Sequence, residues 1–207
     1  MKSYEISAIV ASVIISLGLF WYVGLVIANR IKTVVASWIV STVALTLSLV
    51  TYFGSPHANW LGGSLNAASV FAVFSTLIAV YVRAHHNGED VIFNSFQKRC
   101  LVASGGITIL WIVIVLGMKG TGIIPNLLTQ LLLIISYAML IVKFWKAEKN
   151  TESLFTWWCV FIASVIAIYT ALKKNDVLAF VYAVRSTVMC GILIYVLHRL
   201  EWKIIRH

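Results

Sequence analysis

The sequence predicts an all-α integral membrane protein with seven transmembrane helices, arranged as two three-helix repeats joined by a linker helix. Hydrophobic residues make up 61% of the 207 positions and charged residues 11%, and the mean hydropathy is +0.95. A soluble domain is nearer 45–50% apolar and about 25% charged. Apolar runs long enough to cross a bilayer recur along the whole chain with short polar connections. This pattern leaves no room for a sizeable soluble domain.

Seven apolar runs predict the spans. They are Ile6–Ala28, Val34–Phe53, Trp60–Val82, Leu101–Met118, Ile123–Phe144, Leu154–Leu172 and Val177–His198. The first run is longer than the core of a signal peptide, which predicts a first span rather than a cleaved leader. Pro125 falls near the start of the fifth run, where a helix tolerates proline best. The connection 83–99 is the longest and has room for a short surface helix.

The basic residues predict the orientation of the chain. One side of the membrane receives four of them: Lys2, Lys119, Lys173 and Lys174. The other side receives eleven: Arg30, Lys32, Arg83, Lys98, Arg99, Lys143, Lys146, Lys149, Arg199, Lys203 and Arg206. Lys and Arg are enriched in cytoplasmic loops, so we expect a multi-pass protein with its N-terminus outside and its C-terminus cytoplasmic. The net charge of +9 therefore indicates membrane orientation and disfavours nucleic-acid binding.

A weak internal repeat divides the chain. Tyr52 and Asn59 stand 117 positions before Tyr169 and Asp176, in similar places relative to the predicted spans. Transporters are often built from such repeats. We therefore predict a first three-helix repeat over residues 1–83, a loop and linker helix over 84–119, and a second repeat with a short cytoplasmic tail over 120–207. The alternative is that any two sets of apolar hairpins align loosely.

Arg185 is the strongest candidate functional residue, because a charge at membrane depth is costly and marks a functional site by default. It lies eight residues past Val177, about 12 Å along the helix and close to the expected midplane. All seven acidic residues fall at or beyond the predicted span ends. Two interpretations stay open. Arg185 meets a polar or anionic solute in a cavity, or its side chain snorkels and binds backbone carbonyls.

Polar residues at similar depth extend this candidate site. Tyr182 and Ser186 share the face of Arg185 at helical spacing. Asn66 lies on the third span, and Gln130 shares a face of the fifth span with Asn126 and Tyr137. The candidate substrate-binding residues are Asn66, Gln130, Tyr182, Arg185 and Ser186. For the amides, hydrogen bonding between helices is the alternative role.

The sequence contains no pattern that predicts catalysis or a bound metal. It has no HExxH, GxSxG or P-loop motif and no paired carboxylates within the spans. His85 and His86 have no third ligand nearby in sequence. Cys100, Cys159 and Cys190 form no CxxC pair. We therefore expect no enzyme activity, no cofactor and no metal site.

One motif resembles a known family. The stretch Lys149-Asn150-Thr151-Glu152-Ser153 resembles the K-S-T-E-S stretch that follows the fifth helix of the SWEET sugar facilitators and their PQ-loop relatives. Tyr169, Lys174 and Asp176 resemble that family's residues around the turn between helices six and seven. The resemblance implies seven helices of the three-one-three type, an external N-terminus and transport of a sugar or related solute. The family's solute-site asparagine corresponds to Asn66 in the first half, whereas Ala183 stands at the matching position of the second.

Other positions depart from the family pattern. The PQ dipeptide is missing, with Pro125-Asn126 as its nearest counterpart, and most hinge prolines are absent. The second half also resembles a small membrane module found near lipid A biosynthesis proteins. We therefore expect a facilitator that moves a small polar or anionic solute through the lipid bilayer by alternating access. The alternative is a non-transporting membrane module that binds a lipid or a partner protein. Homo-oligomerisation stays open.

Overall fold

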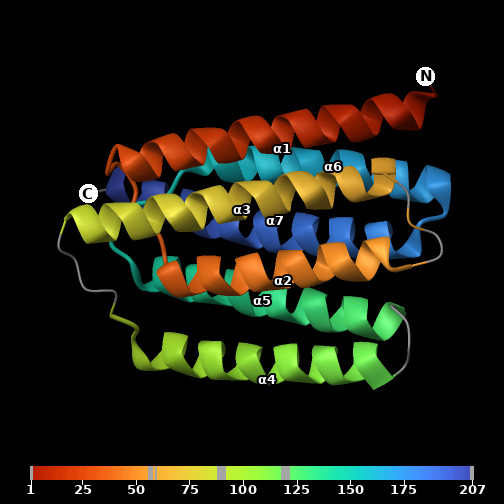
Figure 1. Cartoon of the computed structure of the whole chain (residues 1–207). Helices are drawn as coiled ribbons and strands as arrows, with labels where there is room; N and C mark the ends of the chain where they lie inside the picture. Colours follow the sequence, from red (N-terminus) through yellow and green to blue (C-terminus); the bar gives the residue numbers. More distant parts are fainter. Residues whose placement is uncertain (1, 56–57, 59, 88–91, 118–121, 206–207) are drawn as a thin grey trace.

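The computed structural model describes residues 2–55, 58, 60–87, 92–117 and 122–205. Within these ranges the chain is all-helical, and seven helices are long and apolar enough to cross a membrane, as predicted (Figure 1). They are α1 (Ser3–Ile27), α2 (Val35–Phe53), α3 (Trp60–His86), α4 (Ser95–Gly117), α5 (Ile123–Lys146), α6 (Leu154–Lys174) and α7 (Val177–Ile205).

Several helices are longer than the apolar runs that predicted them. Helix α3 continues to His86 and α7 to Ile205, and α4 begins at Ser95 rather than at Leu101. Hydropathy marks only the hydrocarbon core of about 30 Å, whereas backbone hydrogen bonding continues a helix beyond it. These extensions occupy part of the connection expected over 83–99. Met118, the expected end of the fourth span, lies outside the described residues.

Six of the helices pack in a closed ring. Helix α1 packs against α3 and α6, α2 against α3 and α5, and α7 against α5 and α6. Helix α4 lies outside the ring, against α5 and to a lesser extent α2, and forms one edge of the bundle in Figure 1. It buries only Ser104 and Trp111, and the Trp111 indole donates a 3.1 Å hydrogen bond to Thr51 of α2.

The turn between α6 and α7 is defined by local capping interactions. Asn175 ends α6 in the left-handed conformation, with φ of 52°, which asparagine tolerates better than most residues. Asp176 then caps α7, because its Oδ1 atom accepts a 3.0 Å hydrogen bond from the Ala179 amide. This tight turn places the Asp176 carboxylate at the end of the bundle where α1 begins, which we call the N-terminal end.

The outer surface and the interior of the ring differ in side-chain type. Large apolar side chains such as Leu17, Ile78 and Leu116 point outward and are more than half exposed, as a lipid-facing surface requires. The interior combines apolar side chains with buried hydroxyls and amides. That polar interior, between the two sets of three helices, contains the candidate site.

Candidate functional site

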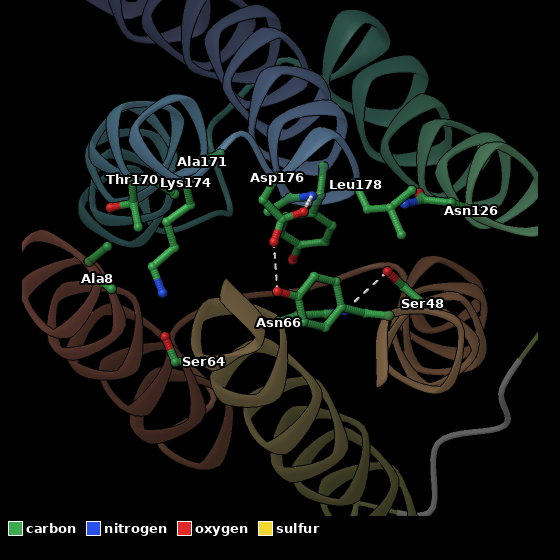
Figure 2. A pocket seen from close by; sticks show the side chains of 15 residues that line it. Ala8, Ser48, Ser64, Asn66, Asn126, Thr170, Ala171, Lys174, Asp176 and Leu178 are labelled. Atoms are coloured by element: carbon green, nitrogen blue, oxygen red, sulfur yellow. Dashed lines mark hydrogen bonds between the residues drawn. The ribbon is translucent and has the colours of Figure 1, made fainter. Parts of the chain in front are cut away.

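Two small cavities lie inside the ring. The N-side cavity, of about 30 Å³, opens near the N-terminal end. Its lining is Ala8, Ala11, Ser48, Tyr52, Ser64, Asn66, Asn126, Ala167, Thr170, Ala171, Lys174, Asp176, Leu178, Ala179 and Tyr182, and Figure 2 shows ten of these residues labelled. At roughly 10–15 Å³ for each water molecule, it has room for two or three waters.

The central cavity, of about 50 Å³, lies deeper in the bundle. Its lining is Ile15, Leu19, Ser37, Trp38, Ser41, Leu45, Ser69, Val73, Leu133, Ser136, Tyr137, Leu140, Trp157, Val160, Tyr182, Arg185 and Ser186. The wall is mainly apolar and aromatic, with Arg185 as its one charged side chain. Of the predicted site residues, Tyr182, Arg185 and Ser186 lie here.

Arg185 is held by one amide and two aromatic rings. Its Nε atom donates a 3.0 Å hydrogen bond to Gln130 Oε1. Its guanidinium carbon lies 5.0 Å from the centre of the Tyr182 ring and 5.9 Å from that of Tyr137, within cation–π range. The structure therefore brings Gln130, Tyr182 and Arg185 together.

A short chain of amides links the two cavities. Gln130 Nε2 donates a 2.8 Å hydrogen bond to Asn126 Oδ1, and Asn126 lines the N-side cavity. Both amides are buried. Gln130 therefore contacts Arg185 of α7 on one side and Asn126 of its own helix on the other.

Tyr182 separates the two cavities, because it lines both of them. Its hydroxyl donates a 3.3 Å hydrogen bond to Ser69 of α3, across the ring from α7. Ser186, one turn further along α7, is buried and accepts a 2.7 Å hydrogen bond from Ser164 of α6. That contact joins α6 to α7 and gives the Ser186 hydroxyl a hydrogen-bond partner within the protein.

Asn66 lies in the N-side cavity, away from Arg185. Its Nδ2 atom donates a 3.1 Å hydrogen bond to Ser48 of α2, visible in Figure 2. Its Oδ1 atom is buried and accepts no hydrogen bond from any described residue. A buried carbonyl oxygen without a donor is costly, so this atom is available to a polar group that enters the N-side cavity.

A hydrogen bond crosses the N-terminal end of the ring. The Tyr52 hydroxyl, at the end of α2, donates to Asp176 Oδ2 at the start of α7 over 2.7 Å. Figure 2 shows the Asp176 carboxylate directed across the cavity toward α2 and α3, with the Lys174 side chain directed toward Ser64. This contact connects the first three helices to the last three beside the mouth of the N-side cavity.

Several contacts join helices and loops at the opposite, C-terminal end of the ring. The Tyr22 hydroxyl of α1 donates a 2.9 Å hydrogen bond to Glu152 Oε1, and the Trp157 indole approaches Oε2 at 3.4 Å. The Lys32 amide donates to the Thr151 carbonyl over 3.1 Å, and the Lys143 ammonium donates to the Lys32 carbonyl. The loops α1–α2 and α5–α6 are thereby joined.

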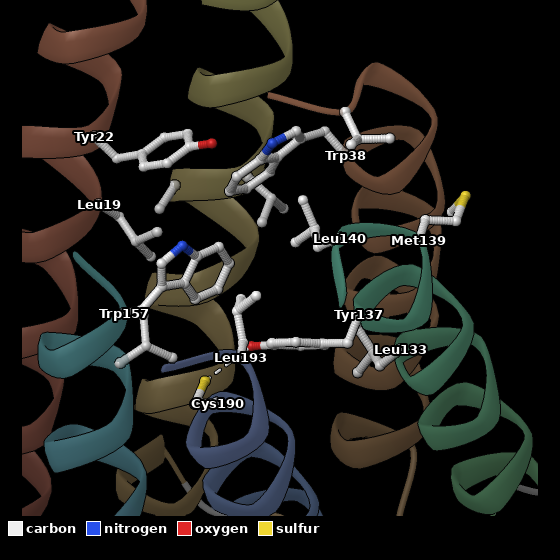
Figure 3. Packing of buried hydrophobic residues seen from close by; sticks show 14 of the residues in the cluster. Leu19, Tyr22, Trp38, Leu133, Tyr137, Met139, Leu140, Trp157, Cys190 and Leu193 are labelled. Carbon is white, nitrogen blue, oxygen red and sulfur yellow. Dashed lines mark hydrogen bonds between the residues drawn. The ribbon is translucent and has the colours of Figure 1, made fainter. Parts of the chain in front are cut away.

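Glu152 lies in an unusual environment for a carboxylate. It is 7% exposed, and burial raises the pKa of its carboxyl to about 7, although the Tyr22 hydroxyl, the Lys143 ammonium and the Trp157 indole each lower this pKa. Figure 3 shows the rings of Tyr22, Trp38 and Trp157 gathered beside this end of the core, with the Tyr137 hydroxyl against Cys190. These rings keep water away from the carboxyl.

Tyr22 and Glu152 are not among the functional residues that the sequence predicts. Glu152 stood at a span end, where an acidic residue is ordinarily solvated, and Tyr22 stood within an apolar run. One feature of the sequence does point to Glu152, namely its position in the stretch 149–153 that resembles the K-S-T-E-S stretch. What the sequence does not contain is the packing of α1 against α6, which buries this carboxyl.

Comparison of the chain with protein families and with curated proteins identifies no relative. A scan of the chain against protein-family models finds no match, and a search of the curated proteins finds none either. Among the described residues no three His, Cys, Asp or Glu side chains are grouped so that they could hold a metal ion.

Proposed function

We propose that this protein is a membrane facilitator that moves a small polar solute, such as a sugar or a related compound, by alternating access between its two halves. The halves are α1–α3 and α5–α7, joined by the linker helix α4, with the N-terminus outside and the C-terminus cytoplasmic. The observation that carries the proposal is a pair of cavities inside the ring. Tyr52 and Asp176, which share a hydrogen bond, line the first. Trp38 and Trp157, whose rings contact Tyr22, line the second.

The order of packing supports a pair of equivalent halves. Within the first three helices α3 packs against both α1 and α2, and within the last three α7 packs against both α5 and α6. The contacts between the halves pair α1 with α6 and α2 with α5. Exchanging the halves leaves this set of contacts unchanged, which fits the internal repeat suggested by Tyr52 and Tyr169. Helix α4, outside the ring, fits a linker.

Alternating access would use the two crossing contacts in turn. Release of the Tyr52–Asp176 hydrogen bond opens the N-side cavity, and release of the Tyr22–Glu152 hydrogen bond opens the C-terminal end. A hydrogen bond between neutral groups contributes a net stabilisation of about 1 kcal/mol, and one to a charged group about 1.5–3 kcal/mol. Each crossing contact can therefore break and re-form without a large energetic cost. In the conformation described here both contacts are formed.

A non-transporting, lipid-binding function is the second candidate, and two observations favour it. The interior cavities hold only a few water molecules. A larger open groove of about 730 Å³ lies instead on the outer face of α7, lined by Tyr195, His198, Arg199, Trp202 and Lys203. Aromatic and cationic side chains at a span end suit an anionic lipid headgroup. Retention of a spin-labelled anionic lipid that is lost in Arg199→Gln would support this function.

The transport proposal is tested by uptake into proteoliposomes that contain the full-length protein. Tyr182→Trp places a bulkier ring between the two cavities, so we expect uptake of a transported polar solute to fall at least fivefold. Tyr195→Trp is the matched control, because Tyr195 lies on the same helix and is 65% exposed on the outer face. Uptake that equals that of empty liposomes for every neutral and charged solute tested would contradict the proposal.

A further inference from the structure

Arg185 has a positive charge at membrane depth that no described side chain balances. Of the described carboxylates, Asp176 accepts its hydrogen bonds from Tyr52 and Ala179 at the N-terminal end. Glu152 is bonded to Tyr22 at the C-terminal end. The one ion pair between described side chains joins His198 and Glu201. Arg185 is partly buried, a charge withdrawn from water without a partner is costly, and Gln130 is neutral.

We propose that the central cavity binds a small monocarboxylate, whose carboxylate group supplies the counter-charge of Arg185. This inference rests on the proposed function in one respect: the bound acid is the transported solute. The site is assembled from α7, which carries Arg185 and Tyr182, and α5, which carries Gln130 and Tyr137.

The guanidinium group is oriented for such a ligand. Gln130 engages Nε, and the rings of Tyr182 and Tyr137 lie within cation–π distance. The two terminal Nη groups form no hydrogen bond with any described residue. A guanidinium presents paired N–H donors that match the two oxygens of a carboxylate. The neighbours of Arg185 therefore hold its side chain in place and leave its terminal N–H donors available to a ligand.

The size and wall of the central cavity indicate a short organic acid. A volume of about 50 Å³ corresponds to roughly three to five water molecules, which suits a two- or three-carbon acid. The wall of the same cavity includes Leu45, Val73 and Leu133. These side chains suit the methyl end of acetate or lactate better than a fully hydrated inorganic ion.

The first experiment compares acids with their neutral amides on the purified full-length protein in detergent. Ligand binding to the native state raises the melting temperature by mass action. We expect acetate and lactate to raise it in a concentration-dependent way, and acetamide and lactamide to leave it unchanged. The amide samples also contain the salt of a bulky sulfonate, which is too large for the cavity, so that all samples have the same ionic strength. Equal stabilisation by acid and amide, or stabilisation by neither, would overturn the inference.

Variants locate the binding. Arg185→Gln removes the charge, so the acid-dependent increase in melting temperature is expected to disappear. Arg185→Lys keeps the charge but lacks the paired donors, so it is expected to fold and to retain a weaker increase. Lys173→Gln is the matched control, because Lys173 is an exposed cation outside both cavities, and its acid response should equal that of the wild type. An acid response that survives in Arg185→Gln would exclude this site.

Uptake separates this inference from the proposed function. The acids could stabilise the protein in an Arg185-dependent way and yet not enter proteoliposomes. That result would support the anion site and contradict transport. Uptake of a neutral sugar, with no binding or uptake of the acids, would leave transport standing and contradict the anion site. Uptake of lactate that is lost in Arg185→Gln and kept in Lys173→Gln would support both.

Discussion

The hydroxyl of Tyr22 donates a 2.9 Å hydrogen bond to the Glu152 carboxylate, which joins α1 to the loop before α6 over a separation of 130 residues. The carboxylate is buried, and its pKa is raised to about 7. The bond therefore couples the protonation of one group to the contact between α1 and the loop before α6. Its consequence is measurable as a dependence of stability on pH.

The protein should lose stability as the pH rises from about 4.5 to about 7. Between these values the native state holds a proton on Glu152 that the unfolded chain, with a pKa of 4.5, releases, so the free energy of unfolding falls. Since one pKa unit is worth 1.36 kcal/mol, the loss from Glu152 is about 3 kcal/mol. Melting temperatures from pH 4 to 8 measure it. In Glu152→Gln this component should be absent, and an unchanged pH profile would contradict the assignment.

Removing the Tyr52 hydroxyl should loosen the N-terminal end. Tyr52→Phe keeps the ring but leaves Asp176 without the donor of its 2.7 Å hydrogen bond, at a cost of about 1–3 kcal/mol. In a background without the native cysteines, a Ser48→Cys reporter in the N-side cavity should then react several times faster with a hydrophilic maleimide. Tyr81→Phe is the control, because Tyr81 is exposed on the outer face; an equal increase there would contradict the prediction.

Helices α1 and α6 approach closely at Gly18. A Cβ atom at this position would lie 2.5 Å from Cys159 Cβ. Because the backbone fixes the position of a Cβ atom, Gly18→Ala must shift α1 relative to α6. We expect a loss of about 1–3 kcal/mol, seen as a lower melting temperature. Gly24→Ala on the same helix meets open space and should be neutral or slightly stabilising. Equal effects of the two substitutions would show that α1 and α6 are less closely packed.

The proposed orientation can be tested with single cysteines on exposed lysines. Lys173 lies at the N-terminal end of the bundle and Lys146 at the C-terminal end, and both side chains are exposed. In intact cells, a membrane-impermeant maleimide should label Lys173→Cys directly and Lys146→Cys only after permeabilisation. The reverse result would invert the topology and assign the larger number of basic residues to the outside.

The structure bears differently on the individual site residues. Depth and helical face predict Gln130, Tyr182, Arg185 and Ser186 as site residues, and Arg185 does contact Gln130 and Tyr182. Asn66, predicted on the same grounds, lies in the other cavity and donates a hydrogen bond to Ser48. Helical periodicity defines the face on which a side chain lies, but it does not identify the helix that the face meets. For that reason the sequence did not separate one cavity from two.

The number and approximate position of the helices were determined by the sequence alone. Apolar runs of membrane length permit few structures other than helices, because every backbone polar group in the bilayer must be satisfied within its own segment. The ring order, the outer position of α4 and the burial of Glu152 were decided only by the tertiary structure. These features depend on contacts between residues far apart in the chain, such as Gly18 with Cys159 and Tyr22 with Glu152. Local sequence patterns contain no information about such pairs, since they arise from packing between helices.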